Sequence, residues 1–271
     1  MTTLLRDVVR TIRHWPIFTF YVAATLVAAA VIGLITVDVI DLGMQHFGEP
    51  SHRTHDVAYG ALFTTLVLGV VVQLRRPEDN VAGMVMALVP GAALMLAALL
   101  AHQVDRVFEF NPLRYAAALA AVTALLHPSG RGFFRSFRLT EVSGPMLALT
   151  AVAAVPLLAL ASTNIGLQRG VIDGHVFMGH YGFMAALAFT IVGVAILASS
   201  GPVGARLTAW VAALLAAVLG VTSVLSPDAA SSLDTGWAVA AIVWAVAFSS
   251  AAARATPPDL GPAERPPAAH P

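Results

Sequence analysis

The feature that most constrains this chain is a series of eight long apolar segments. Of its 271 residues, 58% are hydrophobic and only 11% are charged, whereas soluble domains have roughly 45–50% apolar residues. A helix needs about 20 mostly apolar residues to cross a hydrocarbon core. We therefore expect an all-α integral membrane protein with eight transmembrane helices. The segments cover about residues 17–41, 57–74, 82–101, 113–127, 142–162, 181–199, 207–225 and 236–253.

The distribution of arginine predicts how these helices are oriented. Cytoplasmic loops of membrane proteins carry an excess of Lys and Arg, and this chain has arginine but no lysine. With a cytoplasmic N-terminus, eleven arginines lie inside and four outside, so we expect a multi-pass protein of the cell membrane with both termini cytoplasmic. The inner residues are Arg6, Arg10, Arg13, Arg75, Arg76, Arg131, Arg135, Arg138, Arg206, Arg254 and Arg265, and the outer ones are Arg53, Arg106, Arg114 and Arg169.

A weak internal repeat predicts that the eight helices form two tandem four-helix halves. One offset of 125 residues aligns a histidine, a loop proline and an acidic residue of the first half with matching residue types in the second. The aligned pairs are His55 with His180, Pro77 with Pro202, and Glu109 with Asp234. Because each half has an even number of spans, both halves have the same orientation.

These patterns divide the chain into five parts. Regularly spaced arginines near the N-terminus indicate an amphipathic helix on the membrane surface, and the Pro-rich C-terminal segment is typical of disorder. The parts are an amphipathic cytoplasmic helix at 1–16, the first four-helix half at 17–128, a cytoplasmic linker at 129–141, the second half at 142–253, and a disordered cytoplasmic tail at 254–271.

Histidines and carboxylates gather on the side predicted to face outward. His52 and His55, three residues apart, share a helix face if the second helix begins by residue 50. His175 and His180 are five apart, so one of them is expected in the loop DGHVFMGH, where two glycines permit an irregular path. The expected cofactor-binding residues are His52, His55, His102, His175 and His180, and the expected metal ligands are His52, His55, His175, His180 and Asp56.

Three kinds of chemistry fit this set of residues. Two imidazoles can ligate haem iron. Two or three imidazoles with a carboxylate suit zinc, copper or non-haem iron. Chains of histidine and carboxylate can also relay protons in a transporter. The absence of cysteine excludes disulfides, thiolate metal sites and cysteine nucleophiles.

The string EPSHR, read as E-x-x-H-R at the outward start of the second helix, resembles the haem A synthase family, which is built from two four-helix halves. The resemblance implies that His52 is an outer haem ligand and Glu49 a catalytic carboxylate, with His180 or His175 as the second-half histidine. The family also has a histidine near the outer start of the fourth helix of each half. Those positions here read NPLRYAAAL and DTGWAVAAI, without histidine.

The leading hypothesis is an outward-facing site that binds haem or a transition metal for redox or haem-modifying chemistry. In that case Glu49 and Arg53 handle protons or contact a haem propionate. The alternative is a protein without a cofactor: a small permease, or an accessory subunit of a membrane complex. The expected partners are the lipid bilayer and other membrane subunits, and nucleic acid is not expected.

Overall fold

The structure is a computed structural model in which residues 19–31, 34, 50–75, 77–107, 112–128, 142–202 and 204–255 are described. Within these ranges every regular element is a helix and no strand occurs. The predicted all-α fold is therefore confirmed. The predicted helix at 1–16, the linker at 129–141, Glu49 and residues 256–271 of the predicted tail lie outside the described residues.

Six helices are long and apolar enough to cross a membrane, which agrees with a multi-pass membrane protein. Each overlaps one of the eight predicted segments, although α2 begins earlier and α7 ends later than predicted, and α2 continues into the short 3-10 helix η1. They are α2 (Pro50–Val71) with η1 (Val72–Leu74), α3 (Val81–Leu100), α7 (Gly144–Gly170), α9 (His180–Ser199), α10 (Ala205–Leu225) and α11 (Thr235–Ala255).

The other two predicted spans contain shorter apolar helices. One covers Thr19–Val31 within the first segment, and the other is α5 (Pro112–Leu125) within the fourth. The 14 residues of α5 extend for about 21 Å at about 1.5 Å per residue, less than the roughly 30 Å of a hydrocarbon core. Six candidate spans are thus present in the described residues, and the prediction of eight is not confirmed.

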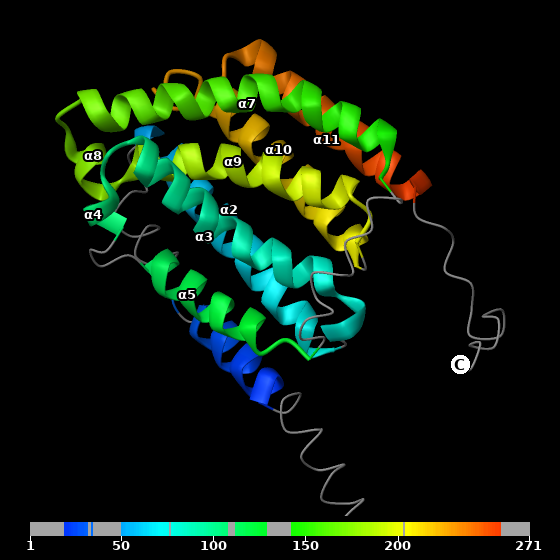
Figure 1. Ribbon diagram of the computed structural model, residues 1–271. Helices are drawn as coiled ribbons and strands as arrows, with labels where there is room; N and C mark the ends of the chain where they lie inside the picture. Colours follow the sequence, from blue (N-terminus) through cyan, green and yellow to red (C-terminus); the bar gives the residue numbers. More distant parts are fainter. Residues whose placement is uncertain are drawn as a thin grey trace, which may run out of the picture.

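In the residues that the structure describes, three further short elements lie between the long helices. They are η2 (Pro77–Asp79) before α3, α4 (Val104–Val107) after α3, and α8 (Gly174–Met178) between α7 and α9. α4 and α8 lie at the same end of the bundle (Figure 1). This is the end that the arginine distribution predicts to face outward.

α9 is the central helix of the described bundle. It packs against α2, α3, α7 and α10, and 67% of its span is buried, whereas the value is 22% for α7 and 28% for α11. α7 and α11 accordingly lie on one outer side of the bundle, and α5 lies on the opposite side (Figure 1). The division into two tandem halves stays a prediction.

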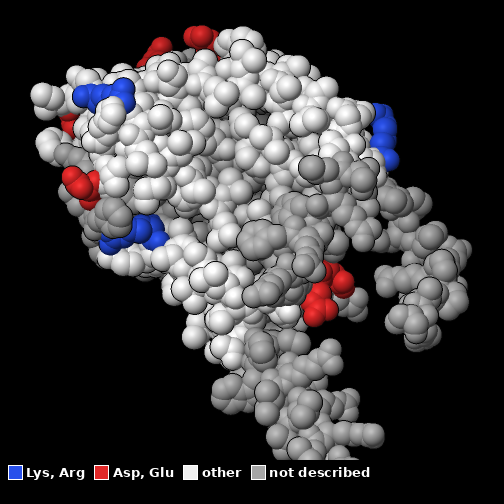
Figure 2. All heavy atoms as spheres, in the orientation of Figure 1, with Lys and Arg blue, Asp and Glu red and all other residues white. Residues whose placement is uncertain are grey.

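The outer surface matches a lipid environment. On the face that Figure 2 shows, charged side chains lie toward the margins, and a broad region without charge separates them. Several large apolar side chains on the outer helices are exposed, as expected where lipid replaces water as the solvent. They include Val152 and Val155 on α7, and Val243 and Val246 on α11.

Small residues allow α2 and α3 to cross closely. A Cβ atom added at Gly69 would lie 2.4 Å from the carbonyl oxygen of Gly83 and 2.8 Å from the Cβ of Ala87. The two backbones therefore meet where a larger side chain has no space, as is common for helix pairs in membranes. Gly60, on the same helix, has no atom within 4 Å of an added Cβ.

This difference predicts opposite effects of one substitution at two positions of α2. Gly69→Ala should lower the free energy of unfolding by about 1–3 kcal/mol, because the methyl group overpacks the crossing. Gly60→Ala should leave stability unchanged or raise it by up to about 1 kcal/mol, since alanine favours the helix. Unfolding of the purified protein in detergent measures both. Equal losses at the two positions would contradict the close crossing.

Candidate metal centre

The first turns of α2 present two histidines to the protein interior. α2 begins at Pro50, and proline suits the first helical position because its missing N–H would have no partner there. His52 and His55 lie three residues apart on this helix and are 8% and 4% exposed. The predicted shared face is therefore formed, and it is directed toward the connection between α7 and α9.

That connection has the irregular path expected from its glycines. Asp173 caps α8, because its Oδ1 accepts a hydrogen bond from the Val176 N–H at 2.9 Å. Gly179 then adopts a left-handed conformation with φ of 74°, which glycine tolerates far better than other residues. The chain turns there and starts α9 at His180. As a result His175 and His180 belong to different helices and need not share one helical face.

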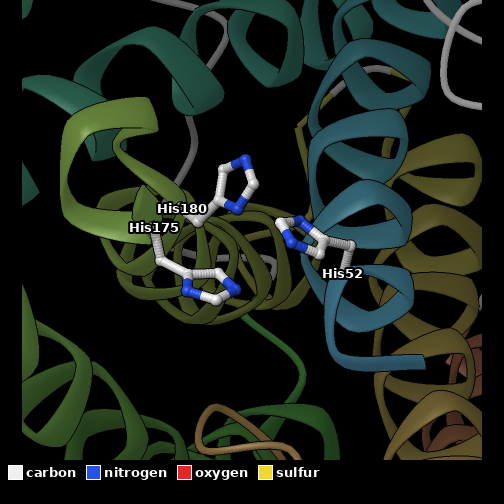
Figure 3. A group of neighbouring side chains, drawn as sticks. All are labelled: His52, His175 and His180. Carbon is white, nitrogen blue, oxygen red and sulfur yellow. The ribbon is translucent and has the colours of Figure 1, made fainter. Parts of the chain in front are cut away.

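Three of these histidines converge on a small volume (Figure 3). His52, His175 and His180 each offer one ring nitrogen, and these three atoms lie within 4.8 Å of one another. The rings of His52 and His175 are stacked with centroids 4.7 Å apart. His180 lies edge-on to His52 at 5.4 Å. We refer to these residues as the three-histidine group.

Asp173 lies beside this group and orients one of its members. His175 Nδ1 lies 3.4 Å from Asp173 Oδ2, which also accepts a hydrogen bond from the Tyr181 hydroxyl at 3.0 Å. The N–H of Val176 foremost, and also Tyr181 and His175, hold the pKa of Asp173 below its usual value against the opposing effect of burial. A charged carboxylate at Nδ1 favours the tautomer protonated there, which in the neutral ring would leave the lone pair on Nε2. That atom is buried and has no hydrogen-bond partner.

His55 borders the three-histidine group but has a different polar partner. Its ring centroid lies 5.2 Å from that of His175 and 5.0 Å from that of His180. Its Nε2 is hydrogen-bonded to the hydroxyl of Ser231 at 2.8 Å, in the connection between α10 and α11. Its Nδ1 is buried without a hydrogen-bond partner. His55 therefore stands next to the group as an additional imidazole.

None of the other predicted site residues that the structure describes belongs to this group of ligand atoms. Arg53 is exposed and Asp56 is half-buried on α2, and neither contributes to the group of ligand atoms. His102 is exposed at the end of α3 and has a positive φ of 56°. It occupies the left-handed position after a helix that glycine or asparagine usually fills. Glu49 lies outside the described residues.

Sequence reasoning assigned no role to Ser231, Tyr181 or the capping function of Asp173. Asp173 carries a local signal, because an aspartate three residues before the N–H that it caps is a common helix start. Ser231 carries none, since it is 176 residues from His55 and only the packing of α10 against α2 brings them together.

Comparisons with protein-family models, curated proteins and solved structures found no match to this chain. The resemblance to the haem A synthase family therefore stays a prediction that rests on E-x-x-H-R and on the arrangement of the helices.

The buried pair of His55 and Ser231 predicts a double-mutant result. Ser231→Ala should lower the free energy of unfolding by about 1–3 kcal/mol, because it leaves a buried imidazole nitrogen without its partner. Added to His55→Phe, the same change should cost much less, since both polar partners are then gone. Unfolding in detergent of both single variants and the double variant measures this coupling. Strictly additive losses would show that the hydrogen bond is unimportant.

Proposed function

We propose that this protein is a membrane metalloprotein that binds a transition-metal ion through His52, His175 and His180 near one end of its helical bundle. The observation that carries the proposal is the convergence of three ring nitrogens within 4.8 Å. A carboxylate behind a metal-bound histidine is a recurring feature of such sites, because it fixes the ring and its tautomer. Asp173 occupies that position behind His175.

The distances suit a single ion after a small adjustment. In a tetrahedral zinc site with bonds of about 2.0–2.1 Å, ligand nitrogens lie roughly 3.3–3.4 Å apart. Rotation of the side chains that moves their nitrogens by about 1.5 Å or less would therefore complete the site. Imidazole ligands suit zinc, copper and iron. Thiolate coordination is excluded because the chain has no cysteine.

The ring arrangement favours a single ion over haem. Two histidines that ligate one haem stand on opposite faces of a flat macrocycle and direct their nitrogens at the iron between them. In the three-histidine group the centroids are 4.7–5.6 Å apart, and His52 and His175 stack face to face. A porphyrin between two of these rings would require them to move apart, so the observed spacing supports a single ion.

Three protein ligands leave a coordination position for water or a substrate, as in catalytic zinc sites. With copper or iron such a site supports redox chemistry, and with zinc it lowers the pKa of bound water. We therefore propose a metal-dependent enzyme, with an oxidoreductase as the preferred class. The proposal includes eight spans in two tandem halves and both termini in the cytoplasm, supported by the arginine distribution and the aligned histidines.

Metal analysis of variants tests this function. The wild-type protein, purified in detergent without chelator and given Zn²⁺ or Co²⁺, should hold one ion per chain. His52→Ala, His175→Ala and His180→Ala should each lose it, because two imidazoles hold an ion far more weakly than three. His102→Ala is the matched control and should bind like wild type, since His102 is exposed and outside the group.

The same preparation distinguishes the competing functions. A Soret band that appears with haemin and disappears in His52→Ala would support haem in place of a single ion. A colourless wild-type protein that binds neither metal nor haem would contradict both cofactor proposals. It would leave a permease or an accessory membrane subunit as the remaining function.

A further inference from the structure

The side chain of Gln168, on the last turns of α7, connects the elements that carry two of the three histidines. Its Oε1 accepts a hydrogen bond from the N–H of Gly182 at 3.1 Å. Its Nε2 donates to the carbonyl oxygen of Val176 at 3.0 Å. Val176 follows His175 on α8, and Gly182 lies two residues after His180 on α9. One side chain thus holds both α8 and the first turn of α9.

Gln103, in the connection between α3 and α4, forms two hydrogen bonds with Gln168. Its Oε1 accepts a hydrogen bond from Gln168 Nε2 at 2.8 Å. Its own Nε2 donates to the backbone carbonyl oxygen of Gln168, also at 2.8 Å. The two glutamines therefore form a reciprocal pair that ties α7 to the end of α3.

Only one orientation of the Gln168 side-chain amide satisfies its hydrogen bonds. Both hydrogens of its amide nitrogen have an oxygen acceptor, and its oxygen faces an N–H donor. Gly182 is the third residue of α9, where the N–H has no partner within the helix. If the amide were reversed, its NH₂ group would face the N–H of Gly182, and two donors would meet. Since Gln168 is 2% exposed, water cannot easily replace these bonds.

We propose that Gln168 is a positioning residue for the metal centre: it sets the distance between His175 and His180 before an ion binds. This inference rests on the proposed metal-binding function. Gln168 fixes the backbone one residue from His175 and two residues from His180, so the loss of its hydrogen bonds lets the two rings drift apart. Ligand sets held in advance bind more tightly, because less ordering is needed on binding.

Asn164, one turn earlier on α7, provides a matched comparison. It is 0% exposed, and its amide donates to the carbonyl oxygen of Leu160 within the same helix at 2.9 Å. Asn164→Asp and Gln168→Glu both place a carboxyl group at a buried position of α7. Only the second removes donors to Val176 and Gln103. General destabilisation therefore affects both variants, whereas repositioning of the histidines affects one.

The experiment compares Co²⁺ affinity, the Co²⁺ absorption spectrum and thermal stability of the wild-type protein with those of Gln168→Glu and Asn164→Asp in detergent. Gln168→Glu should weaken Co²⁺ binding roughly 10- to 100-fold, the range for loss of residues that support metal ligands. Its spectrum should also show altered coordination. Asn164→Asp should lower the melting temperature but keep Co²⁺ affinity within about 3-fold of wild type. A larger loss is not expected, because the amide of Asn164 donates within its own helix, whereas loss of a residue that supports a ligand weakens metal binding by about 10-fold or more.

Gln103→Leu gives the same information if Gln168→Glu does not fold. Gln103 is half-buried, so its loss is easier to tolerate, and it should reduce Co²⁺ affinity in the same direction. Equal affinity in the wild type and in the folded Gln168→Glu or Gln103→Leu variants would overturn the positioning role but leave the metal site. An equal loss in Asn164→Asp would also overturn it. A wild-type protein without Co²⁺ binding would instead contradict the proposed function itself.

Discussion

Hydrogen bonds of polar side chains between helices determine the arrangement at the histidine-bearing end of this bundle. Within a membrane protein a buried polar group has little water to replace a lost partner, so its bonds must come from the protein. Gln168 meets this requirement by bonding to Gly182, Val176 and Gln103 at once. The connection from α7 to α9 is thereby held in one conformation, although it contains flexible glycines.

The same constraint is the reason that buried imidazole nitrogens at this end of the bundle are candidate metal ligands. His55 Nδ1 and His175 Nε2 are buried and have no hydrogen-bond partner, which is unusual for buried polar atoms. Asp173, in contrast, accepts hydrogen bonds from the N–H of Val176 and from the hydroxyl of Tyr181. Of the proposed ligands, His175 would offer an ion the lone pair of its buried Nε2. Packing of α9 at the centre of the bundle keeps these rings in contact with α2.

The helical fold could be predicted from the sequence, because a helix that crosses a bilayer must be apolar and long enough to span the hydrocarbon core. The bounds of α9, α10 and α11 differ from the predicted segments by no more than two residues. In the described part of the chain, α5 and the helix over Thr19–Val31 are shorter than a full span, and apolar composition alone does not fix where a helix ends. An irregular path through DGHVFMGH was predicted from its two glycines, but one histidine was expected in a loop. The structure instead places His175 on α8 and His180 on α9, with the break at Gly179.

The sequence by itself determined the all-helical membrane class, the absence of thiolate chemistry and the histidines that could bind a metal or a cofactor. Those properties depend on composition and on spacing within one helix. The tertiary structure alone decided that His52 meets His175 and His180 and that His102 is not among these ligand atoms. It also decided that Asp173 contacts His175, that Ser231 bonds His55 and that Gln168 bonds α8 and α9. These pairings join residues far apart in the chain, such as His55 and Ser231. Helix packing sets such contacts, and local sequence spacing carries no information about it.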